Sequence, residues 1–101
     1  MAENNNEYYV EFGKPFKFED KEYKGVDMSG IETLTGKQYC EAAKKFSSGG
    51  NVDVIMQQNP EFAAIVASMV TNLPIEFFYA LPAKELNAVK NRVSNYFFGR
   101  D

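Results

Sequence analysis

The stretch NPEFAAIVASMVT, residues 59–71, decides how the rest of this chain must fold. Asn59 can cap a helix, Pro60 fits the first helical position, and Glu61 places a negative charge in the first turn. Among the next nine residues, only Ser68 is polar. A helix that is apolar on nearly every side is either enclosed by its own chain or shared with a protein partner. The sequence leaves both readings open.

Two proline-led helix starts follow this stretch. Leu73-Pro74 opens a short helical segment that extends to Ala80, and Pro82 opens a longer one, because the residue before a proline disfavours a continued helix. In the longer segment apolar residues recur at spacings of three and four, and Gly99 supplies a natural stop. The C-terminal part of the chain is therefore predicted to hold two further helices.

The same region carries two aromatic triplets, at residues 77–79 and 96–98. Three consecutive aromatic side chains on one helix cannot all face a single core. We therefore expect one or two of each triplet to point elsewhere, either against the N-terminal part of the chain or toward a partner.

The N-terminal part of the chain has a different periodicity. Five apolar residues there share one parity, which is typical of a strand with one buried face: Tyr8, Val10, Phe12, Phe16 and Phe18. Gly13 and Pro15 interrupt the pattern and indicate a bulge or an edge position. The polar residues 19–22 predict a turn, and a return strand follows through Met28. The region is predicted to be a β-hairpin, whose aromatic face must lie against the helices because an isolated hairpin is marginal in water.

The segment GIETLTGKQ, residues 30–38, superficially matches a phosphate-binding loop. Five residues separate its glycines where that motif has four, and Gln38 replaces the hydroxyl that binds magnesium. A helix start explains the segment better, since Thr35 and Gln38 can form a reciprocal capping box. The helix is predicted to run to about Phe46, while Ile31 anchors the preceding loop to the core.

The composition offers no basis for catalysis. The 101 residues include no His, and Cys40 is the single cysteine. We expect Cys40 to be a small buried filler rather than a nucleophile, because no base is available to activate it. The sequence predicts no catalytic residues, no cofactor and no metal site, and hence a protein that is not an enzyme.

Charge and hydropathy restrict the partners. The net charge of −3 and the lack of clustered Lys and Arg argue against nucleic acid. No segment approaches the roughly 20 apolar residues of a membrane span, so the chain is predicted to be soluble and intracellular. The fold class is predicted to be α+β, an N-terminal β-hairpin followed by three to four α-helices. A flexible N-terminus, residues 1–7, is expected to precede a single small domain, residues 8–99.

Three motifs in a fixed order resemble a known family. They are F-x-F-x-x-K-E-Y at residues 16–23, D-x-S-G-x-x-x-L-T-G-K at residues 27–37, and L-P-x-E-F-x-x-A-L-P-A-K-E at residues 73–85. Over residues 14–97 the chain resembles the small tail assembly chaperones of long-tailed bacteriophages and prophages, of the P2 tail-protein E type. None of the motifs is catalytic, so the resemblance depends on their joint order.

The resemblance implies a chaperone that binds the tape measure protein, keeps this long helical chain soluble, and leaves as the tail tube polymerises. It also implies a location in the host bacterial cytoplasm and absence from the mature virion. In that family a frameshifted longer form recruits tail tube protein, and the present chain would be the short product. The family motif assigns no residue-level binding site.

The partner-binding residues are therefore predicted from the apolar helix and the first aromatic triplet. A chaperone for an apolar helical chain needs apolar surface and no catalytic group. The predicted set is Phe62, Ile65, Val66, Met69, Val70, Phe77, Phe78 and Tyr79. The same surface could instead make self-contacts in a homo-oligomeric ring, which would make the chain a structural tail component.

Overall fold

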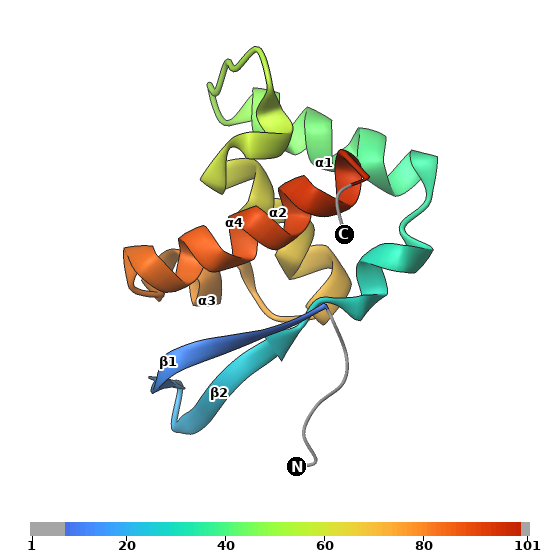
Figure 1. Ribbon diagram of the computed structural model, residues 1–101. Coiled ribbons are helices and arrows are strands. Elements are labelled where there is room, and N and C mark those ends of the chain that lie inside the picture. Colours follow the sequence, from blue (N-terminus) through green and yellow to red (C-terminus); the bar gives the residue numbers. More distant parts are fainter. Residues whose placement is uncertain (1–7, 100–101) are drawn as a thin grey trace.

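The computed structural model describes residues 8–99 as a two-stranded antiparallel hairpin followed by four α-helices (Figure 1). The elements are β1 Tyr9–Phe18, β2 Lys21–Asp27, α1 Gly36–Ser48, α2 Pro60–Thr71, α3 Ile75–Ala80 and α4 Ala83–Phe97. Two short 3-10 helices, Ser29–Thr33 and Met56–Gln58, lie on either side of α1 in the sequence. The predicted α+β class is confirmed. The predicted flexible N-terminus, residues 1–7, lies outside the described residues.

Helix α2 lies at the centre of the fold and contacts α1, α3, α4 and both 3-10 helices. It begins as predicted, with the Asn59 side chain accepting a hydrogen bond from the Glu61 backbone N–H at 2.8 Å and Pro60 at its first position. Every residue from Phe62 to Ala67 is buried. Residues 62–67 of α2 are thus enclosed by the chain itself, as in the first of the two readings, whereas Ser68, Met69 and Val70 are only half-buried.

Aromatic rings from α1 and α4 surround the first buried residue of α2. The Phe62 ring lies 5.9 Å from Phe46 and 6.1 Å from Tyr39, both on α1, and 6.2 Å from Phe97 on α4, measured between ring centroids. The two contacts with α1 are edge-to-face and the contact with Phe97 is tilted, and such ring pairs add to the stabilisation that burial itself provides. They hold α1 and α4 on two sides of α2.

The connection between β1 and β2 is shorter than the four-residue turn predicted at residues 19–22. Only Glu19 and Asp20 form the connection, and both have positive φ values, 51° and 67°, as the two-residue turns that suit twisted strands require. Lys21 already belongs to β2. The register shifts between Glu11 and Phe16, which confirms the bulge expected from Gly13 and Pro15.

Phe77 joins the hairpin to the helices, so this member of the first aromatic triplet packs against the N-terminal part of the chain, the first of the two alternatives. Its ring centroid lies 4.8 Å from that of Tyr23 and 5.3 Å from those of Phe16 and Phe18. Phe78 is buried beside it, whereas Tyr79 is 53% exposed. As expected from three consecutive aromatics on one helix, the third points away from the core.

Helix α1 has the predicted start, but its cysteine is not buried. The Gln38 N–H donates to Thr35 Oγ1 at 3.1 Å and the Thr35 N–H donates to Gln38 Oε1 at 3.0 Å, completing the capping box. Cys40 is exposed, so the prediction of a buried filler is wrong. The buried side chains of α1 are Ala42 and Phe46, and Cys40 falls outside the stripe that they define.

None of the helices within residues 8–99 has the length and hydropathy needed to cross a membrane.

We predict that Phe77→Ala lowers the free energy of unfolding by about 3–5 kcal/mol, because it leaves a cavity where the hairpin meets the helices. Urea denaturation followed by circular dichroism measures the change. Tyr79→Ala, two residues along the same helix, is the matched control and should cost far less because that ring is half exposed. Equal losses for the two variants would contradict the role assigned to Phe77.

Candidate partner-binding surface

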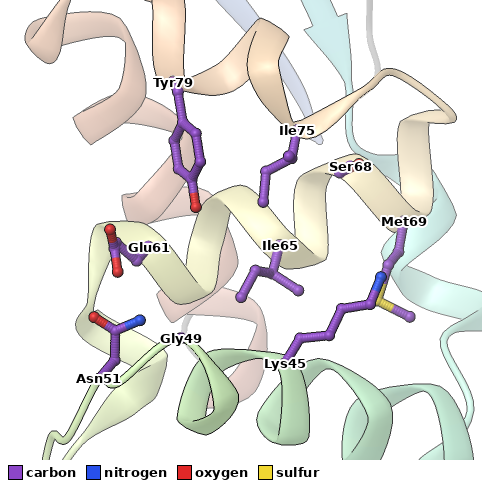
Figure 2. Close-up of a pocket in the computed structure, with 9 residues that line it drawn as sticks. All are labelled: Lys45, Gly49, Asn51, Glu61, Ile65, Ser68, Met69, Ile75 and Tyr79. Atoms are coloured by element: carbon purple, nitrogen blue, oxygen red, sulfur yellow. The ribbon is translucent and has the colours of Figure 1, made fainter.

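A groove of about 380 Å³ lies between α2, α3 and the C-terminal end of α1 (Figure 2). Helix α2 contributes Ile65 and Met69, four residues apart, and α3 contributes Ile75 and Tyr79, also four apart. Residues at this spacing share one side of a helix. Two short apolar rows from different helices therefore face the same space.

The one polar residue in the apolar part of α2 serves the structure rather than the groove. The Ser68 hydroxyl donates a hydrogen bond to the Leu73 carbonyl oxygen at 2.7 Å. That bond ties the end of α2 to the turn that leads into α3. Because the hydroxyl is satisfied within the chain, Ser68 does not need a polar partner from outside.

Opposite charges stand at the two ends of the groove. In Figure 2 the Lys45 side chain extends from α1 toward Met69, whereas Glu61 lies at the end to which the Tyr79 hydroxyl is directed. Partial burial, together with the negative charges of Glu61 and Glu76, raises the pKa of the Tyr79 phenol above its ordinary value. The phenol thus stays neutral at physiological pH and presents an apolar ring with a single polar tip.

The structure distributes the eight predicted interface residues between the core and the surface. Phe62, Val66, Phe77 and Phe78 have no exposed area, and Ile65 is 6% exposed. The first four could meet a partner only if the fold opened, because the other elements of this small domain already cover them, whereas Ile65 lines the groove with its small exposed area. Of the rest, the groove brings together Met69 and Tyr79, with Ile65 between them, while Val70 lines a different groove beside β2.

The loop that follows α1 carries apolar surface that the sequence prediction missed. Val52 is 95% exposed and Val54 is 99% exposed, and Ile55 is also exposed. The loop projects from the helices at the top of Figure 1. It lies next to the groove, since Gly49 and Asn51, at its start, line the groove wall. The available signal was the Val-Asp-Val sequence after a glycine pair, in which apolar residues alternate without a neighbouring strand to cover them.

Hydrogen bonds brace this loop. The Asn51 side-chain amide donates to the Phe46 carbonyl oxygen at 3.1 Å, and the Asn59 amide donates to Asp53 Oδ2 at 2.9 Å. The Ile55 N–H donates to Asp53 Oδ1 at 3.2 Å. The two valines on either side of Asp53 are therefore held outward by a defined local structure. Together, the groove and these valines form the candidate partner-binding surface.

Within residues 8–99, no three His, Cys, Asp or Glu side chains gather so that they could hold a metal ion. Comparison of the chain with models of protein families, with curated proteins and with solved structures finds no match.

The hydrogen bond from the Asn59 side-chain amide to Asp53, which helps to hold the loop, can be tested through the pKa of Asp53. This hydrogen bond, followed by that from the Ile55 N–H, lowers the pKa of the Asp53 carboxyl below its ordinary value. A pKa that is lower in the folded chain means that this interaction stabilises the fold above the ordinary aspartate pKa. The contribution is lost as the pH falls through the lower, folded value.

We predict that Asn59→Ala raises the pKa of Asp53 toward its ordinary value, measured by an NMR titration of the carboxyl carbon. The variant also removes the cap of α2 and should lower the thermal midpoint of unfolding. Asn59→Asp is the matched control, because it keeps a capping oxygen but supplies no amide donor. An unchanged Asp53 pKa in both variants would show that the amide does not brace the loop.

Proposed function

We propose that this chain is a phage tail assembly chaperone that binds the tape measure protein and keeps it soluble while the tail tube assembles. Two independent features support the proposal. The order of the three motifs over residues 14–97 resembles that family, and the folded domain carries a groove with two apolar rows beside an exposed apolar loop. The exposed apolar surface is the observation that carries the proposal, because a domain without such surface could not shield another chain from aggregation.

An apolar face of a helical segment is the ligand that suits the groove. Such a segment presents side chains at spacings of three and four residues, which can lie along the rows formed by Met69, Ile75 and Tyr79. Tyr79 is the expected anchor, since a half-exposed aromatic ring in an apolar row contributes strongly when a partner covers it. Lys45 and Glu61 at the two ends can pair with charges that flank the apolar face.

The proposal also accounts for release. A groove of this size offers little apolar area, so one copy would hold a helical segment weakly. Many weak sites along a long ligand can keep it soluble, and polymerising tail tube protein can then displace them one at a time. In this proposal the chain acts in the host bacterial cytoplasm and is absent from the mature virion. A frameshifted longer form would recruit the tail tube protein.

Co-expression with the large helical protein encoded nearby tests the proposal. The chain should increase the soluble yield of that protein and co-purify with it in several copies. If the two proteins do not associate, and the chain instead remains in purified virions as a homo-oligomeric ring, the structural alternative replaces the chaperone proposal.

We predict that Tyr79→Asp weakens binding of the helical partner at least about tenfold, the loss expected for an aromatic anchor. Pull-down and calorimetric titration measure the loss. Phe98→Asp is the matched control, because Phe98 is another exposed aromatic ring outside the groove. The assignment of the groove is refuted if both variants bind as tightly as the parent chain while circular dichroism shows both folded.

Val52→Asp with Val54→Asp tests the loop separately from the groove. Both side chains are exposed almost completely, so the double variant should keep its thermal midpoint of unfolding. Partner binding should fall because the loop can no longer cover apolar surface on the ligand. Unchanged binding would confine the ligand to the groove.

A further inference from the structure

The outer edges of β1 and β2 differ in whether another strand could pair with them. On β1, the Gly13 N–H donates to Glu85 Oε2 of α4 at 2.9 Å, and Pro15 has no N–H to offer. The bulge between Glu11 and Phe16 further breaks the line of backbone groups. These are the devices by which natural sheets block the addition of another strand. The β1 edge is thus closed.

The outer edge of β2 has no proline and no bulge, and no side chain that the structure describes is seen to bind its backbone N–H groups among residues 21–26. In the part of the chain that the structure describes, residues 8–99, the sheet has the order β1-β2, and no third strand pairs with β2. Glu22 and Lys24 are exposed on it. A groove of about 490 Å³ extends along this side of β2, with apolar walls that include Tyr23, Val26 and Val70. An unpaired strand beside an apolar groove is a site where an extended strand can add to a sheet.

The charges on β2 are self-complementary in one register. If two copies of β2 pair antiparallel about a two-fold axis, Glu22 and Lys24 can be aligned in three ways. Placing Glu22 opposite Glu22 or Lys24 opposite Lys24 sets like charges against each other on the axis, which destabilises a sheet. The third register places Tyr23 opposite Tyr23 on the axis, with a Glu22–Lys24 pair on each side of it. Only this register makes every such charge contact attractive.

The side chains on the other face of β2 agree with this register. Tyr23 is half-buried against Phe77, and the Lys21 amino group lies 5.5 Å from the centre of the Tyr23 ring. Two tyrosines that meet at the axis would cover each other's remaining exposed area. Lys21 would lie opposite Gly25 of the other copy, where the Tyr9 phenol covers the glycine and no charged side chain is met. Among the residues of β2 that would pair directly, 21–25, no like charges lie opposite each other.

We propose that the β2 edge binds a second copy of this chain, so that two hairpins form one four-stranded antiparallel sheet with Tyr23 on the two-fold axis. Backbone hydrogen bonds between the strands and the covered apolar groove hold the dimer, while Glu22 and Lys24 select its register. A four-stranded sheet is also more stable than an isolated hairpin. The proposal uses none of the residues of the partner-binding groove, and it stands whether or not a tape measure protein is the ligand.

Charge reversal tests the register directly. Glu22→Lys alone sets Lys against Lys on both sides of the axis, and Lys24→Glu alone sets Glu against Glu. Each single variant should dimerise at least about tenfold more weakly than the parent chain, measured by sedimentation equilibrium over a concentration series. The double variant, Glu22→Lys with Lys24→Glu, restores opposite charges and should dimerise like the parent chain.

A mixture of the two single variants gives the sharpest outcome. Glu22→Lys from one copy then faces Lys24→Glu from the other, so native mass spectrometry should detect a mixed dimer in excess of either homodimer. Glu41→Lys on α1 is the matched control, because it changes the net charge equally at an exposed site outside the sheet. A parent chain that stays monomeric, single variants that dimerise normally, or a mixture without a mixed dimer would each overturn the proposal.

Discussion

Enclosure of α2 is the physical constraint on which the rest of this structure depends. A helix with one polar residue in its apolar part cannot remain in water, because each exposed Phe, Ile or Val forgoes about 1.5–3 kcal/mol of burial free energy. The chain has little mass with which to surround it, so nearly every other element is recruited. Helices α1, α3 and α4 and both 3-10 helices contact α2, and Phe62 is surrounded by aromatic rings from two of them.

Helix α3 connects that core to the candidate surface. In its six residues, Phe77 turns toward the hairpin while Tyr79 turns outward to the groove. The same helix therefore fixes both the seam with β1 and β2 and the wall of the partner-binding groove. Because Phe77 and Phe78 are fully buried, α3 cannot rotate to expose more apolar surface without opening the core. The groove is presented by a rigid element.

The sequence predicted those features that local chemistry determines. Pro60, Asn59 and Thr35 mark helix starts through capping and proline stereochemistry, and the structure has helices that begin there. Period-two spacing predicted the hairpin, and Gly13 with Pro15 predicted its bulge. The exposure of Cys40 and the burial of Phe62 were not predictable, because they depend on which element covers which face. The exposure of Val52 and Val54 was missed because their alternation with Asp53 marks a possible apolar edge but does not show whether another element covers it.

The groove and the β2 edge, if both act as proposed, would reinforce each other. A dimer carries two grooves, and binding of one raises the effective concentration of the other along the same ligand chain. A long helical protein with repeated apolar faces could then be held by dimers whose single grooves bind only weakly. Weak individual sites also let a polymerising competitor displace the two grooves of a dimer one after the other. Once the first groove has been released, the second no longer gains from the raised effective concentration and dissociates readily. A small apolar area per site and dimerisation through the sheet therefore suit a partner that must be held for a time and then surrendered.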